Sequence, residues 1–187
     1  TVTMGSDVVI DASALVQGQG GTVVLWSDIH LSDSVTDAQG RILARGGVLG
    51  GDGGQVETSG RWLKLGDGIF VSTKAPAGRD GVWLLDPEDL WIRDPSWSGY
   101  GYTTTGTTTI TALAANSSAP ILVSGVDTRD RGGGVSVLRT DTINAALSQG
   151  SVSIVATGSI DATGWEAGAS YPNHYICLLY TSPSPRD

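Results

Sequence analysis

Short apolar runs of alternating character recur along the chain, and glycine separates them. The clearest series lies between residues 46 and 92, and its runs are Val56-Glu57-Thr58, Trp62-Leu63-Lys64-Leu65, Ile69-Phe70-Val71-Ser72 and Val82-Trp83-Leu84-Leu85. Short runs with period-two alternation, bounded by Gly, Asp and Pro, predict β-strands joined by tight corners. Val56 is expected to face the core and Glu57 the solvent, because successive side chains of a strand point to opposite faces.

Two phrases repeat within this pattern. The phrase Gly-Gly-x-Val-x-(Val/Leu) occurs in full or in part at residues 20–25, 53–56, 80–84 and 133–138, and the phrase Ile-x-(Ala/Val)-x occurs at residues 10–13, 42–45, 69–72 and 160–163. Like phrases in the first half are about 25–35 residues apart, a spacing typical of a solenoid, in which each turn needs stacked neighbours to bury its apolar face. Ser27 to Gly40 is polar and is interpreted as a longer loop that leaves the stack.

One segment predicts a short helix. Thr140 or Asp141 is a suitable N-cap, Ile143, Ala146 and Leu147 fall on one helical face, and Gly150 follows the last apolar position. This helix, near Thr142-Leu147, is expected to cover a flank of the β-stack. The chain then divides into stacked turns at residues 1–92, an aromatic and threonine-rich excursion at 93–120, further turns with the helix at 121–176, and a tail at 177–187.

Composition excludes several functional classes. The chain has 187 residues, 27 of them glycine, a formal net charge of −8, and only two lysines. Nucleic-acid binding needs a basic stripe that neutralises phosphates, and this chain has none. An anionic membrane surface would repel it for the same reason, and no run approaches the ~18 apolar residues of a membrane span.

The tail differs from the rest of the chain. Cys177–Asp187 resembles one reading frame of the transposase adapter used in short-read library preparation, and we exclude it from the predicted fold. The remaining sequence has no cysteine, which argues against a disulfide scaffold, a thiol nucleophile and a Cys-ligated zinc site. The chain also opens without an initiator Met and is interpreted as an internal fragment of a longer protein.

Acidic and glycine-rich segments offer candidate sites. Asp86-Pro87-Glu88-Asp89 could supply a glycosidase pair or a cation site, but we interpret it as a solvated acidic turn because no basic residue or histidine lies nearby in sequence. The segment from Gly50 to Glu57 resembles a nonapeptide calcium repeat, yet Gln55 stands where a carboxylate ligand is required. A glycine corner is the preferred interpretation.

The remaining candidates are weaker. A solvated loop is preferred for His30, a loop packed on the flank for the possible sugar platform Trp97, Tyr100 and Tyr102, and a chance match for the glycosylation sequon at Asn116. Arg61, Lys64 and Asp67 are close in sequence and could belong to a β-helix enzyme site, but alternation sends Arg61 and Lys64 to opposite faces of a strand. The second histidine, His174, lies beside the tail. We therefore predict no catalytic, cofactor-binding or metal-binding residue, and no cofactor.

An ordered set of phrases carries a family resemblance. The phrases are Gly21-Thr22-Val23-Val24-Leu25-Trp26-Ser27-Asp28, Gly50-Gly51-Asp52-Gly53-Gly54-Gln55-Val56-Glu57-Thr58-Ser59-Gly60, Trp83-Leu84-Leu85-Asp86-Pro87, and Thr142-Ile143-Asn144-Ala145-Ala146-Leu147 followed by a Val/Ile strand. Together they resemble the filamentous-haemagglutinin-like adhesins, which are large exoproteins of two-partner secretion. The resemblance covers most of residues 1–165.

The resemblance implies an all-β, right-handed parallel β-helix in a rod-like, non-enzymatic segment of a secreted or cell-surface adhesin from a Gram-negative bacterium. The implied partner is an outer-membrane transporter that recognises a region absent from this chain, with a host or bacterial receptor that the sequence does not identify. Two alternatives stay open: the stalk of a contact-dependent inhibition toxin, and a β-helix enzyme that acts on polysaccharides. The family phrases are structural, so no site residue is carried over from them.

Overall fold

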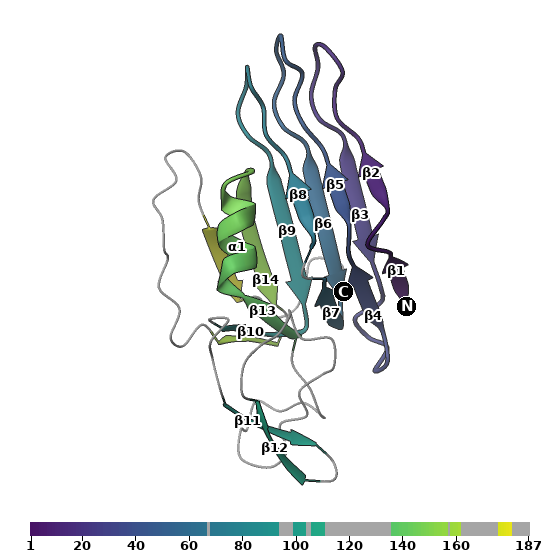
Figure 1. Cartoon of the computed structure of the whole chain (residues 1–187), viewed down its shortest axis with the longest axis vertical. Helices are drawn as coiled ribbons and strands as arrows, with labels where there is room; N and C mark the ends of the chain where they lie inside the picture. Colours follow the sequence, from purple (N-terminus) through teal and green to yellow (C-terminus); the bar gives the residue numbers. More distant parts are fainter. Residues whose placement is uncertain are drawn as a thin grey trace.

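A computed structural model describes residues 1–66, 68–93, 99–103, 106–110, 136–156, 158–161 and 176–180. These residues form an all-β structure with one short helix (Figure 1). The elements in chain order are β1 Val2–Met4, β2 Val9–Asp11, β3 Thr22–Trp26, β4 Val35–Ala38, β5 Arg41–Leu43, β6 Gln55–Gly60, β7 Trp62–Leu65, β8 Phe70–Ser72, β9 Val82–Pro87, β10 Asp89–Arg93, β11 Gly99–Thr103, β12 Gly106–Ile110, β13 Ser136–Arg139, α1 Thr140–Leu147, β14 Ser151–Ala156, β15 Ser159–Asp161 and β16 Ile176–Tyr180.

The strands belong to four parallel sheets and one antiparallel pair. The first sheet has the order β1-β4-β7, the second β2-β5-β8, the third β3-β6-β9-β14-β16, and the fourth β13-β10-β15. From β1 to β9 the chain visits the first, second and third sheets in the same order three times. We call one circuit through the three sheets, from a strand to its partner strand in the same sheet, a passage. Strands that are consecutive in sequence therefore lie in different sheets, and each strand pairs with its counterpart one passage later.

Glycine-rich phrases set the register of the third sheet. Thr22 pairs with Gln55, and Gln55 pairs with Val82, so the phrases predicted at 20–25, 53–56 and 80–84 lie directly beside one another. A Cβ on Gly54 would lie 2.0 Å from the carbonyl oxygen of Gly21, and one on Gly81 would lie 1.9 Å from that of Gly54. Only glycine fits this close approach of backbone to backbone.

The second repeated phrase is correct only in part. Ile10 pairs with Ile42 as predicted, but Ile42 pairs with Val71 rather than with Ile69. Ile69 and Val71 are both apolar and two residues apart, so they face the same side of a strand and sequence alone does not choose between them. The fourth copies of both phrases also differ, because Ser136–Arg139 and Ser159–Asp161 pair with β10 in the fourth sheet.

The prediction of a loop from Ser27 to Gly40 is wrong. This segment contains β4, which pairs with both β1 and β7, and its Thr36 side chain is completely buried. The Thr36 hydroxyl donates to the carbonyl oxygen of Ser59 at 2.7 Å and lies 2.9 Å from the Ser27 hydroxyl. A buried polar side chain is tolerated when its hydrogen bonds are made, so a polar sequence here forms an interior strand.

The predicted helix is confirmed as α1. Ile143, Ala146 and Leu147 are buried on one face as expected. The N-cap position is occupied by Arg139, which makes no side-chain capping bond, so the prediction of a Thr140 or Asp141 cap is wrong. α1 lies between β13 and β14 in sequence and contacts β8, and β14 pairs with β9. The helix therefore covers the flank beside the second sheet.

The fourth sheet does not follow the repeating order of the first three sheets. β10 follows β9 directly, but β13 comes from much later in the chain and pairs with β10 in parallel. The backbone N–H of Leu63 in β7 donates to the Ser136 hydroxyl in β13 at 2.9 Å. β13 therefore lies against both β7 and β10, although no backbone ladder joins it to β7 among the described strands.

Two segments that were not predicted to belong to the stacked sheets contain paired strands. The excursion at 93–120 contains an antiparallel pair, in which Gly99 pairs with Ile110 and Thr103 with Gly106. The tail excluded from the predicted fold contributes Cys177 to Tyr180 to β16, which pairs in parallel with β14.

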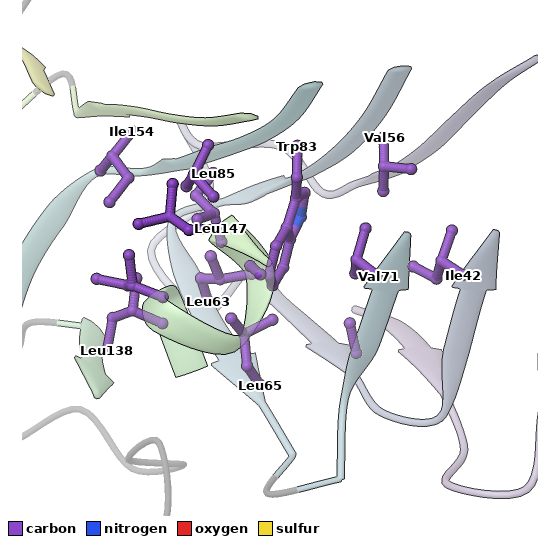
Figure 2. Close-up of a cluster of buried hydrophobic side chains, with 14 of the residues drawn as sticks. Ile42, Val56, Leu63, Leu65, Val71, Trp83, Leu85, Leu138, Leu147 and Ile154 are labelled. Carbon is purple, nitrogen blue, oxygen red and sulfur yellow. The ribbon is translucent and has the colours of Figure 1, made fainter. Parts of the chain in front are cut away.

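The core lies between the sheets. Figure 2 shows Val56 and Trp83 of the third sheet pointing into the interior, where Val56 faces Ile42 and Val71 of the second sheet. Leu85 of the third sheet is buried in the same core cluster. The same cluster includes Leu63 and Leu65 of the first sheet, Leu138 of β13, Leu147 of α1 and Ile154 of β14. A tryptophan enters this apolar core because its Nε1 donates to the Thr58 hydroxyl at 3.1 Å.

Val56 and Glu57 occupy opposite faces as predicted, but both are buried. Glu57 lies in register between Val24 and Leu84, and the Ser59 hydroxyl donates to its carboxylate at 2.8 Å. The expectation that Glu57 faces solvent is therefore wrong. Its neighbours on the outer face of the sheet cover it.

We expect Val56→Asp to destabilise the fold by about 3 kcal/mol or more, because it places an unpaired charge in the core. Gln55→Asp is the matched control, since Gln55 is the adjacent, exposed residue of the same strand. Thermal and urea unfolding of both variants would measure the difference. Equal stability of the two variants would contradict the assignment of Val56 to the interior.

Candidate binding groove

Three connections between the second and third sheets project from the ends of the strands. They comprise residues 12–21, 44–54 and 73–81, and we call them the arms (Figure 1). Backbone hydrogen bonds join each arm to the next: the Gly20 N–H donates to the Asp52 carbonyl at 2.9 Å, and the Gly53 N–H to the Arg79 carbonyl at 2.8 Å. The arms therefore continue the stacking of the sheets.

An open groove of about 910 Å³ lies at the base of the second and third arms. Its described lining consists of Asp52, Gly53, Gly54, Gln55, Lys74, Ala75, Gly78, Arg79, Asp80, Gly81, Val82, Ser148 and Ser151. The helix enters through Ser148, the residue after α1, and the third sheet through the first residues of its strands.

Two charged side chains of the groove, Asp52 and Arg79, are engaged with each other. The Arg79 guanidinium donates to Asp52 Oδ2 at 3.1 Å, and the Arg79 backbone N–H donates to Asp52 Oδ1 at 2.9 Å. These bonds, the backbone one first, hold the pKa of Asp52 below its ordinary value. The Ala75 N–H donates to Asp80 Oδ1 at 2.5 Å. Asp52 is thus a permanent carboxylate at neutral pH, suited to binding a cation or hydroxyl rather than to donating a proton.

A second polar cluster surrounds the acidic segment 86–89. The prediction of a solvated turn is wrong, because Pro87 ends β9, Asp89 begins β10, and Asp89 is buried. Arg61 Nη2 lies 2.9 Å from Glu88 Oε2, and both side chains are mostly buried. No basic residue is close to this acidic segment in sequence, as the prediction stated, but one is close to it in the folded chain. The preceding passage supplies it.

Three ion pairs join residues that are 27 positions apart. They are Asp37 with Lys64 at 2.9 Å, Asp52 with Arg79 at 3.1 Å, and Arg61 with Glu88 at 2.9 Å. The register has the same interval, since Val35 pairs with Trp62 and Gln55 with Val82. A search for opposite charges at that interval would have found all three pairs from the sequence.

The other candidates are not brought together. Arg61 and Lys64 bind different carboxylates, and His30 lies exposed between β3 and β4, where its backbone N–H donates to Asp28 Oδ1 at 2.9 Å. In the calcium-like segment, Asp52 is engaged by Arg79, and Gln55 is exposed. Asp67, Trp97, Asn116 and His174 lie outside the described residues, as do the side chains of Tyr100 and Tyr102.

The described part of the chain has neither a cluster of metal-binding side chains nor a long apolar helix. Within it, no three or more His, Cys, Asp or Glu side chains gather as a possible metal site. No helix there has the length and apolar character needed to cross a membrane.

Comparison of the chain with protein-family models and with curated protein sequences finds no match.

Removing the Glu88 carboxylate of the Arg61–Glu88 ion pair tests the structural role of the acidic segment. We expect Glu88→Gln to lower stability by about 1–3 kcal/mol, because it leaves the Arg61 guanidinium poorly compensated inside the fold. Asp52→Asn is the control, since the Arg79 side chain of that pair is 91% exposed and its attraction is screened by solvent. Unfolding by urea at two salt concentrations would compare them. An equally small effect of both changes would contradict the structural role of Glu88.

Proposed function

We propose that this chain is a rod-forming structural segment of a large secreted or surface-exposed bacterial adhesin exported by two-partner secretion. In this proposal the strands wind as a right-handed parallel β-helix, and each passage is one coil. The chain would provide length and stiffness between a transporter-recognition region and a receptor-binding region. It would have no catalytic role.

One observation carries the proposal: the chain returns to the same three sheets in the same order, in parallel and in register. β6 and β9 pair over six consecutive residues, and β3 and β6 over five. Successive strands of a sheet are about 4.8 Å apart, so each added coil would lengthen the molecule by that amount. An arrangement that grows by repetition along one axis suits a spacer, because its length changes without a change in its cross-section.

The distribution of polar groups also favours a structural role. Three ion pairs among the described residues join positions one repeat apart, and the buried hydroxyls of Thr36, Thr58 and Ser59 bond to other strands of the stack or to their own strand. These groups are used to hold one passage against the next. Residues that serve catalysis are instead commonly directed into a pocket with their polar atoms available to a substrate.

Duplication of one passage tests the proposal. Residues 55–81 form a complete passage, because Gln55 and Val82 are paired neighbours. A second copy inserted after Gly81 should fold cooperatively and extend the molecule by about 4.8 Å, which small-angle X-ray scattering can measure. Fused behind a two-partner secretion domain, this variant and the parent chain should both reach the medium through the matching transporter.

The control inserts the same 27 residues in scrambled order, which retains length and composition but removes the register. We expect this variant to unfold at a lower temperature and to be degraded before export. A duplicated variant that behaves like the scrambled one would contradict the proposal, because a fold that cannot accept another passage is not a repeating rod. Retention of both the parent and the duplicated chain in the periplasm would contradict the proposed export.

A further inference from the structure

The tips of the first two arms expose large aliphatic side chains. Leu15 is 92% exposed, Val16 56%, Val48 60% and Leu49 72%. Val48 and Leu49 are the central residues of a turn that the Gly50 N–H closes on the Gly47 carbonyl at 3.2 Å. Single exposed aliphatic residues are common on protein surfaces, but a contiguous apolar patch often marks a contact site.

Hydrogen bonds between the arms hold the four side chains together as one patch. The Leu49 N–H donates to the Val16 carbonyl at 2.9 Å, and the Gly18 N–H donates to the Gly50 carbonyl at 2.8 Å. A third bond, from the Gly46 N–H to the Lys74 carbonyl at 2.9 Å, joins the second arm to the third. The tips are therefore presented by a backbone-paired support rather than by independent loops. Figure 1 shows the arms side by side, projecting in one direction from the strands.

The arms differ in charge from the rest of the chain. They contain three cations, Arg45, Lys74 and Arg79, and two carboxylates, Asp52 and Asp80, which gives the arms a net charge of +1 in a chain of net charge −8. Lys74 and the Arg79 side chain are exposed. The repulsion expected between this chain and an anionic membrane is therefore weaker at the arms than over the rest of the chain.

We propose that the tips of the arms insert into the surface of a lipid bilayer. Projecting aliphatic side chains with basic residues behind them match the interfacial region of a membrane, where apolar groups enter the acyl boundary and cations lie near phosphates. A second copy of the chain fits less well, because four side chains are far fewer than the roughly 20–30 residues that each partner contributes to a stable protein interface. The contact is peripheral and independent of the proposed adhesin role.

Vesicle flotation tests this proposal with the full chain. The chain should float with phosphatidylcholine vesicles, and more strongly when phosphatidylglycerol is included. The double variant Leu15→Ser and Val48→Ser should bind both kinds of vesicle about tenfold more weakly, since it removes apolar groups that would enter the acyl region. Its melting temperature should equal that of the parent, because both side chains lie outside the core.

The matched control is the double variant Val9→Ser and Leu31→Ser, which also removes one valine and one leucine. Val9 is 56% exposed and Leu31 57% exposed, and neither belongs to an arm. This control should bind vesicles like the parent chain.

Three results would overturn the proposal. The first is a parent chain that does not float with either kind of vesicle. The second is an equal loss of binding in the tip variant and the control. The third is a parent chain that forms dimers by sedimentation and does not bind vesicles, with a tip variant that is monomeric, since that result assigns the patch to a second copy.

Discussion

Backbone hydrogen bonding between passages is the constraint on which the rest of this structure depends. Every buried strand must pair its N–H and C=O groups, and from β1 to β9 the partner is the strand that follows 27 to 34 residues later, as with Val35 and Trp62 or Val2 and Thr36. Parallel pairing at this distance aligns each residue with its counterpart in the next passage. Apolar positions therefore pack on apolar positions, and glycines lie beside glycines.

The same alignment decides where polar and charged groups can lie. Thr36 and Thr58 are completely buried because other strands satisfy their hydroxyls: Thr36 donates to the Ser59 carbonyl in β6, and Thr58 accepts from the Trp83 indole N–H in β9. Arg61 and Glu88 pair across one passage, and so do Lys64 and Asp37. These ion pairs and hydrogen bonds therefore link one repeat of the stack to the next.

The sequence predicted the parts of this fold that local pattern determines. The glycine phrases located the third sheet in register, and α1 followed from apolar residues at Ile143, Ala146 and Leu147. The predictions from sequence were wrong where the burial and pairing of a residue depend on a neighbour that is distant in sequence. The polar sequence of β4 predicts a loop, but Ser27 and Ser59 bond to the Thr36 hydroxyl and allow it to be buried. The acidic segment predicts a solvated turn, but Arg61, which is 27 residues earlier in the chain, pairs with its Glu88. The apolar tips were also missed, because exposure depends on which residues the stack leaves uncovered.

Disulfide trapping measures the register of the passages most directly. In a Cys177→Ser background, Gln55→Cys combined with Val82→Cys places two thiols on directly paired residues, whereas Gln55→Cys combined with Leu84→Cys displaces them by two positions along the strand. Mild oxidation should cross-link the first pair rapidly and the second pair slowly, because a displacement of two residues offsets the thiols by about 6–7 Å along the strand and takes them beyond disulfide geometry. Equal rates for the two pairs, or faster cross-linking of the displaced one, would contradict the parallel, in-register stacking described here.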